Sequence, residues 1–400
     1  MNNTQSFASL KSQLDDAINA AIGEGAVVGA VALIERRGEI LLSEAYGYAD
    51  RDSKTPMRED SIFRVASMSK PITSALALML IEDGLLDLDT PIDKWIPELS
   101  DLQVQSAASL DVEKSARSIS VRDLLTHRSG IAYPFSAPEH LAAALREATG
   151  TLDIVPDCWP DEWIAKLGKV PLLFQPGQQW HYGYSTDVLG VLLSRVAGCL
   201  LGELMQRRIF SRLAMNDTGF YCRKRDLDRM TTAYVRSPTN GELQVFDPAN
   251  GRWSRQPAFE SGGAGLVSTT KDYLQFARFL LRSPASSPAA SPALMSRSSI
   301  ELMKENFFGE EDHARPFLGM EGYWRQKGFG LGLSVTTDAQ SLPYRATNGE
   351  FNWPGAFGTY WFAAPEKDLI GLLYVQEYWG ASQLPIKLHE VAYALADAVD

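Results

Sequence analysis

The sequence contains few cysteines and no run of basic residues. Its three cysteines are Cys158, Cys199 and Cys222, an odd number without the spacing of metal ligands. We therefore expect a reducing compartment and no disulfide framework. Lysine and arginine total 38 against 49 aspartates and glutamates, which gives a net charge of −11. Without a basic run to hold phosphates, neither a nucleic acid nor an anionic membrane is an expected partner.

The N-terminal stretch lacks the pattern of a signal peptide. No positively charged segment precedes an apolar run there, and no part of the sequence has the length and composition of a transmembrane helix. Instead, Leu10, Leu14, Ile18 and Ile22 recur on one face of a predicted amphipathic helix. Together with the cysteine pattern, these absences predict a cytoplasmic protein.

Strand patterns occur at both ends of the chain, and helical patterns occupy its middle. Two runs rich in β-branched residues, 27–34 and 39–46, flank Glu35-Arg36-Arg37-Gly38 and predict a hairpin. Three further predicted strands cover residues 329–336, 356–363 and 369–376, and an amphipathic helix over 384–399 closes the chain.

The simplest way to pair these strands in one sheet indicates the fold class. We predict an α/β (α+β) fold in which both chain ends build one mixed antiparallel sheet, flanked by helices, beside a mainly helical second lobe. The 400 residues are predicted to form a single catalytic domain. Within it, an α/β lobe of residues 1–82 and 318–400 would face a helical lobe of residues 83–317, with the site in the cleft between them.

A Ser-x-x-Lys sequence, Ser67 to Lys70, stands at the start of the most clearly patterned helix. Apolar residues recur behind it at helical spacing from Ile72 to Leu80, and Gly84 is placed to end the helix. Pro71 lacks an N–H and therefore suits the first turn. Ser67 then lies at or just before the helix start, with Lys70 about one turn away on the same side.

This spacing suits nucleophilic catalysis. A serine hydroxyl is a weak nucleophile until a neighbouring group takes its proton, and a lysine one turn away can do so. The helix N-terminus also offers partial positive charge and free N–H groups where an oxyanion forms. The motif is short, however, and Ser268-Thr269-Thr270-Lys271 also matches it. We interpret that second match as the cap of a helix over residues 272–281, with Thr269 as the capping residue.

Two further clusters lie downstream. The first, Trp180-His181-Tyr182-Gly183-Tyr184-Ser185, forms a loop before a predicted helix, and a tyrosine there can transfer protons beside the cation of Lys70. The alternative is that this aromatic loop only packs. The second cluster spans residues 349–359 and is a glycine-rich entry to a strand, where the backbone can approach a ligand closely.

Taken in order, these motifs resemble the serine β-lactamase and penicillin-binding-protein family. The sequence is most similar to its class C-like esterase branch, the family VIII carboxylesterases. The resemblance runs from about residue 27 to residue 399. Four supporting segments carry it between the main motifs: LLTHRSGI at 124–131, PG at 176–177, DVLG at 187–190 and GGAGLVST at 262–269.

The resemblance implies a role for each matching position. Ser67 would be the acyl-accepting nucleophile, with Lys70 and Tyr182 as its partners in proton transfer. The backbone N–H groups of Ser67 and Ala356 would form the oxyanion hole. The remaining expected substrate contacts are Tyr133, Tyr184, Trp353 and Gly355. Tyr184 falls where the lactamases carry an asparagine. No metal or cofactor is implied.

The third motif departs from the lactamase pattern. β-Lactamases carry Lys-Thr-Gly where this chain has Trp353-Pro354-Gly355, whereas the esterase branch typically shows Trp-Gly-Gly. The lactamase lysine helps to hold a substrate carboxylate, so Trp353 exchanges a cation for an apolar wall. Pro354 cannot donate a hydrogen bond, but the expected donor, the N–H of Ala356, is retained.

The predicted activity is therefore that of a serine carboxylesterase that cleaves short-chain acyl esters through an acyl-enzyme on Ser67. Three activities of the same family remain open: acyl transfer, β-lactam hydrolysis, and D-amino-acid peptide or amide hydrolysis. A non-catalytic penicillin-binding-protein-like protein is the alternative from another class. The sequence leaves open whether Lys70 or Tyr182 is the base, and it leaves the oligomeric state open. The expected partner is a small ester.

A Ser-His-Asp hydrolase is disfavoured. No Gly-x-Ser-x-Gly elbow occurs, because the stretch from Gly183 to Asp187 fails at its last position. His181 adjoins Tyr182 and could line the site, although a structural role is favoured.

Overall fold

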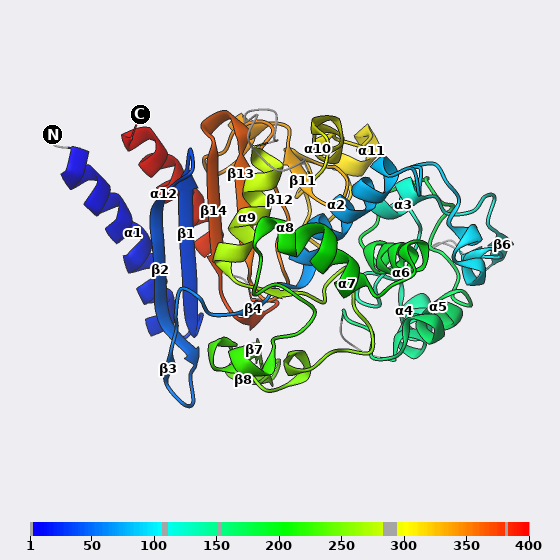
Figure 1. The fold of residues 1–400 in the computed structure, drawn as a ribbon, viewed down its shortest axis with the longest axis horizontal. Coiled ribbons are helices and arrows are strands. Elements are labelled where there is room, and N and C mark those ends of the chain that lie inside the picture. The colour runs from blue at the N-terminus through cyan, green and yellow to red at the C-terminus, as the bar shows by residue number, and fades with distance from the viewer. Residues whose placement is uncertain (1–2, 106–110, 151–153, 283–293, 381–382, 400) are drawn as a thin grey trace.

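The computed structural model describes residues 3–105, 111–150, 154–282, 294–380 and 383–399. An eight-stranded sheet forms one side of the molecule (Figure 1), in the order β10-β11-β12-β13-β14-β1-β2-β3. The N-terminal strands are β1 (Gly29–Arg36), β2 (Glu39–Asp50) and β3 (Thr55–Pro56). The C-terminal strands are β10 (Lys327–Phe329), β11 (Ser334–Thr336), β12 (Phe351–Asn352), β13 (Tyr360–Ala364) and β14 (Leu369–Tyr374).

The two chain ends meet where β1 pairs with β14. This pairing is antiparallel and runs from Val31 opposite Tyr374 to Arg36 opposite Leu369. The turn between β1 and β2 contains Arg37 and Gly38, both with positive φ, as a tight two-residue hairpin turn requires. The prediction of one antiparallel sheet built from both chain ends is confirmed.

Alternation along β1 gives the sheet two buried faces. Ala30, Ala32 and Ile34 belong to the apolar cluster that includes the helices α1 (Asn3–Gly23) and α12 (Leu384–Ala398). Val31 and Leu33 belong to the main core with α2 (Ser69–Glu82) and α9 (Thr270–Leu281). Because successive side chains of a strand point to opposite faces, a fully buried strand needs helices on both sides. The predicted terminal helices provide one of these layers.

Most of the remaining helices lie beyond α2, on the right of Figure 1. They include α3 (Val121–Leu125), α4 (Glu139–Thr149), α5 (Pro160–Leu167), α6 (Ser185–Ala197) and α7 (Leu201–Met205). Three small sheets accompany them: β15 (Glu377–Tyr378) with β7 (Ala233–Arg236) and β8 (Leu243–Asp247); β4 (Phe63–Arg64) with β9 (Val267–Ser268); and β5 (Gln103–Gln105) with β6 (Val112–Lys114). The prediction of a mainly helical second lobe is confirmed in outline.

The division of the chain into lobes at residues 82 and 318 stays a prediction. Helix α9 lies inside the range 83–317, yet it packs against β13, β14 and β1 of the large sheet. Among the described residues, no single helix has the length and apolar character of a membrane span. One pair, Ser185–Ala197 with Leu201–Leu213, reaches that length only together and is bent by 77°.

The prediction of one strand over residues 329–336 is wrong, because a turn at residues 330–333 separates β10 from β11. Gly332 in this turn has a φ of +82°. A Cβ atom at Gly332 would lie 2.1 Å from Ser74 Oγ of α2. The turn therefore packs directly on the buried helix and breaks a run that reads as a continuous strand in the sequence. The strand predicted over residues 356–363 also starts late, at Tyr360, because Gly355 N–H donates to Thr359 O in the preceding turn.

A buried polar cluster joins the sheet to α12. Glu350, just before β12, is fully buried and accepts a 2.6 Å hydrogen bond from Tyr393 Oη. Its other carboxylate oxygen lies 3.7 Å from Nδ1 of the buried His389. Burial raises the pKa of Glu350 to about 8, and burial lowers the pKa of His389 to about 3.

We expect Glu350→Gln to change the pH dependence of stability. A carboxyl whose pKa is higher in the folded state stabilises the fold below its unfolded pKa, and this contribution is lost as pH rises through the folded pKa. Wild-type stability should therefore fall between about pH 5 and pH 8 by a few kcal/mol. The neutral amide introduced by the substitution should remove most of that fall. Thermal unfolding at several pH values measures the difference.

The matched control is Glu366→Gln, which changes an exposed glutamate in the turn at Pro365–Lys367. Its Tm profile should run parallel to that of the wild type. A Glu350→Gln profile that also runs parallel would show that Glu350 is ionised in the folded protein at neutral pH. His389 should lower the stability of both proteins equally as the pH falls below about 6.5, the pKa of a histidine in the unfolded chain, because the folded state keeps the His389 ring neutral.

Candidate active site

Ser67 lies in a tight turn between β4 and α2. A 3-10 turn covers Ala66–Met68, and α2 begins at Ser69, so the predicted position of Ser67 just before the helix is confirmed. Ala66 has a φ of +42°, an unusual conformation for a residue with a side chain. Ser69 Oγ stabilises the turn, because it donates to Ala66 O at 2.7 Å and accepts from Leu266 N–H.

Two side chains converge on the Ser67 hydroxyl. Lys70 Nζ lies 3.2 Å from Ser67 Oγ, and Tyr182 Oη lies 2.7 Å from it. Lys70 is fully buried, and its Nζ also lies 4.6 Å from the centroid of the Tyr182 ring. The structure therefore brings Ser67, Lys70 and Tyr182 together, although 115 positions separate Ser67 from Tyr182.

The loop that carries Tyr182 is anchored by polar contacts. Ser136 Oγ donates to Tyr182 O at 2.9 Å, and the same hydroxyl lies 3.1 Å from Nε2 of His181. Burial lowers the pKa of His181 to about 4, so its imidazole is neutral at physiological pH. His127 packs against the Tyr182 ring with 5.1 Å between ring centroids. Both histidines therefore occupy structural positions around Tyr182.

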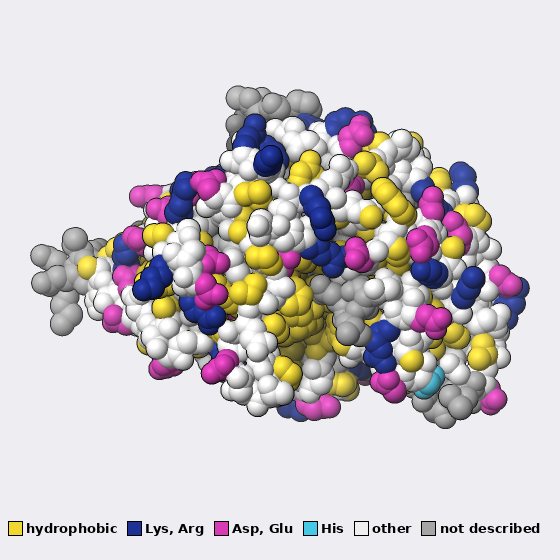
Figure 2. All heavy atoms as spheres, turned by 90° about the horizontal axis from the view of Figure 1, so that it is seen from below, with side chains coloured by type: hydrophobic (Ala, Val, Ile, Leu, Met, Phe, Trp, Pro, Cys, Tyr) yellow, Lys and Arg dark blue, Asp and Glu magenta, His cyan; other side chains and the backbone are white. Residues whose placement is uncertain are grey.

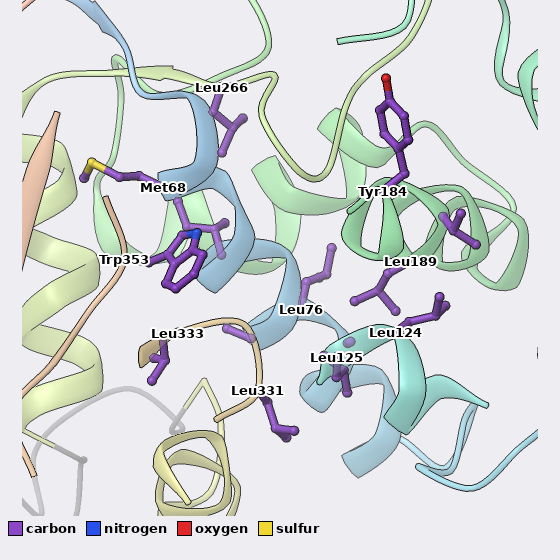
Figure 3. Packing of buried hydrophobic residues seen from close by; sticks show 14 of the residues in the cluster. Met68, Leu76, Leu124, Leu125, Tyr184, Leu189, Leu266, Leu331, Leu333 and Trp353 are labelled. Atoms are coloured by element: carbon purple, nitrogen blue, oxygen red, sulfur yellow. The ribbon is translucent and has the colours of Figure 1, made fainter. Parts of the chain in front are cut away.

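Tyr133 and Tyr184 occupy different positions relative to Lys70. Tyr133 Oη lies 3.1 Å from Lys70 Nζ, so this residue belongs to the polar centre of the site. Tyr184 is fully buried, with its ring centroid 4.4 Å from that of Tyr133 and 5.5 Å from that of Trp163. In Figure 3 it lies on the opposite side of α2 from Trp353. Tyr184 therefore packs behind Tyr133, and its predicted substrate contact stays a prediction.

Trp353 forms a wall behind Tyr182. Its side chain is 1% exposed, and its ring centroid lies 5.5 Å from that of Tyr182. The other aromatic neighbours of the indole are Phe317, Trp324 and Phe329. The indole therefore backs Tyr182 from inside the protein, and its predicted contact with the substrate stays a prediction.

Gly355 and Ala356 follow Trp353 and are partly exposed. Ala356 O accepts a 2.7 Å hydrogen bond from Trp379 N–H, which fixes this stretch to the segment after β15. Ala356 also packs against the apolar cluster that contains Ala66, the residue before Ser67. The N–H of Ala356 therefore stays a predicted oxyanion donor, on a segment fixed close to Ser67.

Two exposed aromatic residues stand beside this centre, and no sequence motif pointed to either of them. Phe135 is 43% exposed, and its ring stacks on Tyr133 at 5.0 Å. Trp379 is 49% exposed, and its ring meets Phe135 edge-on at 5.4 Å. The two rings come from segments 244 positions apart in the sequence (379 − 135). Figure 2, which views the molecule from below Figure 1, shows a hollow with hydrophobic side chains on its floor.

The second Ser-x-x-Lys sequence has no such surroundings. Ser268 Oγ lies 2.8 Å from Thr218 Oγ1, and Lys271 forms a 3.1 Å ion pair with Glu59. Thr269 Oγ1 accepts the N–H of Asp272 as the N-cap of α9. The predicted cap is confirmed, although α9 begins at Thr270, two residues earlier than expected.

Among the described residues, no group of three or more histidine, cysteine, aspartate or glutamate side chains is placed to hold a metal ion. The three cysteines are free thiols, and Cys222 is buried. Asp187 is a buried residue of the site to which sequence reasoning assigned no role. A carboxylate inside an otherwise apolar helical stretch, DVLGVLL, was the available signal.

The chain is similar to a family of known proteins over nearly its whole length. The family description that matches residues 14–388 is Beta-lactamase. An uncharacterized protein of Mycobacterium tuberculosis is 37% identical over 360 residues, which cover 88% of this chain and 86% of that protein. Esterase EstB of Burkholderia gladioli is 31% identical over 407 residues, which cover 97% of this chain and 96% of the esterase.

A solved structure of a similar protein has the same fold. EstCE1, described as a hydrolase with promiscuous acyltransferase activity, superposes with a TM-score of 0.82 and 27% sequence identity. The match covers 97% of this chain and 99% of EstCE1.

The geometry predicts that only one of the two Ser-x-x-Lys serines is reactive. A fluorophosphonate probe should label the wild-type protein once, and Ser67→Ala should abolish the label. Ser268→Ala should keep the label, because its hydroxyl contacts Thr218 and no base. Mass spectrometry of the labelled peptide measures the site. Labelling that survives in Ser67→Ala and disappears in a folded Ser268→Ala would reverse the assignment.

Proposed function

The chain belongs to the beta-lactamase family, and from that membership we propose that it is a serine carboxylesterase that forms an acyl-enzyme on Ser67. One observation carries the proposal: Lys70 Nζ and Tyr182 Oη both reach the Ser67 hydroxyl, at 3.2 and 2.7 Å, where a helix begins. The likeness to an esterase over 97% of the chain supports the choice of an ester as substrate.

In the proposed first step, Ser67 Oγ attacks the carbonyl carbon of the ester. Its proton passes to the pair formed by Lys70 and Tyr182, and the carbonyl oxygen becomes an oxyanion. The N–H groups of Ser67 and Ala356 would stabilise that oxyanion, at about 3–4 kcal/mol per donor. The bond from the carbonyl carbon to the alcohol oxygen then breaks, and the alcohol leaves with the transferred proton.

In the second step, a water molecule attacks the acyl group on Ser67. The same pair takes the proton of the water and returns a proton to Ser67 Oγ as the acid departs. Either Lys70 or Tyr182 can be the base in this scheme, because both reach the same oxygen atom. An alcohol in place of water would give acyl transfer, the second candidate activity, favoured by the description of EstCE1 as a hydrolase with promiscuous acyltransferase activity.

The aromatic surroundings of the site favour neutral esters. Where related lactamases present a lysine to a substrate carboxylate, this chain has the buried Trp353. Phe135 and Trp379 add exposed apolar surface beside Tyr133 and Ala356. An ester with a short apolar acyl chain suits such a site better than an anionic lactam. A cytoplasmic location is part of this proposal, supported by the three free cysteines.

Substrate preference is the direct test of this function. We expect kcat/KM for p-nitrophenyl butyrate to exceed that for nitrocefin by about 10- to 100-fold or more. A charge-assisted contact contributes roughly 1.5–3 kcal/mol, and its loss lowers affinity by about that factor. Initial rates on both substrates measure the ratio. Equal rates would favour a lactamase. If the fluorophosphonate probe labels the protein but neither substrate is turned over, the enzyme accepts a narrower range of acyl donors or acceptors than these two substrates test.

Lys70→Met and Tyr182→Phe should each lower kcat by about 10²- to 10⁴-fold with little change in KM, because proton transfer occurs only in the transition state. The double variant should be little worse than the worse single variant, since both groups serve one proton transfer. Steady-state kinetics on p-nitrophenyl butyrate measure this. Strictly multiplicative losses would argue that the two residues act independently.

The matched control is Tyr273→Phe. Tyr273 is also buried, but its hydroxyl donates to Met68 O at 2.9 Å rather than to Ser67. This variant should lose some thermal stability and keep its kcat.

A further inference from the structure

Lys70 is a buried amine whose direct hydrogen-bond partners are all uncharged groups. Its Nζ lies 3.2 Å from Ser67 Oγ, 3.1 Å from Tyr133 Oη and 2.8 Å from Gly263 O. A fully buried ammonium group is costly unless negative charge lies near it. Asp187, on the first turn of α6, supplies such a charge without touching Lys70 itself.

Two bridges connect Asp187 to Lys70, and each passes through one intermediate residue. Tyr133 Oη contacts Lys70 Nζ and donates to Asp187 Oδ2 at 3.4 Å. Gly263 accepts from Lys70 through its carbonyl and donates to Asp187 Oδ1 through its N–H at 3.2 Å. A Cβ atom at Gly263 would lie 2.4 Å from the Asp187 carboxylate. Glycine at this position therefore lets the carboxylate approach the backbone.

The contacts of Asp187 suit an ionised carboxylate. It is fully buried and only accepts hydrogen bonds, from Ser261 Oγ, Gly263 N–H and Tyr133 Oη. Burial raises the pKa of Asp187, while Lys70 and these donors oppose the rise. Burial and Asp187 together raise the pKa of Tyr133 well above its usual value. Tyr133 therefore stays a neutral phenol that can donate to Asp187.

Among the described residues, the other groups that face Lys70 include no second carboxylate. Tyr182 presents its ring at 4.6 Å, and Tyr184 packs on Tyr133 from behind. His127 is buried, and burial followed by the charge of Lys70 lowers its pKa well below the usual value, so its ring is neutral. Within the described part of the chain, Asp187 is the carboxylate that shares hydrogen-bond partners with Lys70.

We propose that Asp187 is a positioning residue that, through Tyr133 and Gly263, sets the pH at which Ser67 becomes nucleophilic. This inference rests on the proposed function of Ser67, Lys70 and Tyr182. A nearby anion favours the protonated form of a lysine and of a tyrosine alike. The charge of Asp187 therefore favours transfer of the Ser67 proton to the Lys70–Tyr182 pair, whichever of the two residues is the base.

The test is the pH dependence of fluorophosphonate labelling in Asp187→Asn, a variant of nearly the same shape. The acid limb of the labelling rate should move to lower pH by about one unit or more, because a buried charge a few ångströms away has been removed. The plateau rate should fall, since a weaker base accepts the Ser67 proton less readily. Labelling reports Ser67 directly and needs no knowledge of the natural ester.

Tyr133→Phe is the second variant. It removes one bridge and keeps the carboxylate, so its acid limb should lie between those of the wild type and Asp187→Asn. If Asp187→Asn fails to fold, this variant alone decides, and an unchanged acid limb in Tyr133→Phe would overturn the proposal.

Asp272→Asn is the matched control. Asp272 is another buried carboxylate that accepts hydrogen bonds, from Asp217 N–H and Thr218 Oγ1, at the start of α9. It should lower Tm and leave the acid limb in place. A folded Asp187→Asn with a reduced plateau and an unmoved acid limb would show that Asp187 acts only through packing. A wild-type protein that the probe fails to label at any pH would instead refute the proposed function.

Discussion

Helix α2 is buried on every side, and this constraint shapes the rest of the molecule. Every residue from Ser69 to Leu80 is buried, so the helix has no solvent face on which to place polar groups. Its N-terminal turn nevertheless carries Ser67, Ser69 and Lys70 into the interior. Unpaired polar groups there would each cost free energy, and surrounding segments must therefore supply partners for each of them.

Those partners come from three separate parts of the chain. The segment before β9 supplies Gly263 O to Lys70 and Leu266 N–H to Ser69. The loop after α3 supplies Tyr133, and the loop before α6 supplies Tyr182. The polar contacts that allow α2 to be buried are the same contacts that surround Ser67 with proton-transferring groups. In this protein the stability of the central helix and the chemistry of the site depend on one hydrogen-bond network.

Much of the fold follows from local patterns in the sequence. The β1–β2 hairpin, α2, α6 and α12 were predictable because each buries a regular stripe or run of apolar residues. The break between β10 and β11 was not, because it depends on the contact of Gly332 with Ser74. Three members of the polar centre could be predicted from motifs, and Asp187 could not, since nothing local indicates that it faces Lys70. Phe135 and Trp379 were missed for the same reason.

Trp353 shows how one substitution in a motif can act through packing. Its ring lies among Phe317, Trp324 and Phe329 and supports the face of Tyr182. A lysine at this position would place a charge in an aromatic cluster, at a large desolvation cost. Under the proposed function, the cluster as a whole, and not residue 353 alone, would favour uncharged substrates. A change of specificity towards anionic lactams would require the neighbouring rings to change together, because Phe317, Trp324 and Phe329 all pack against the indole.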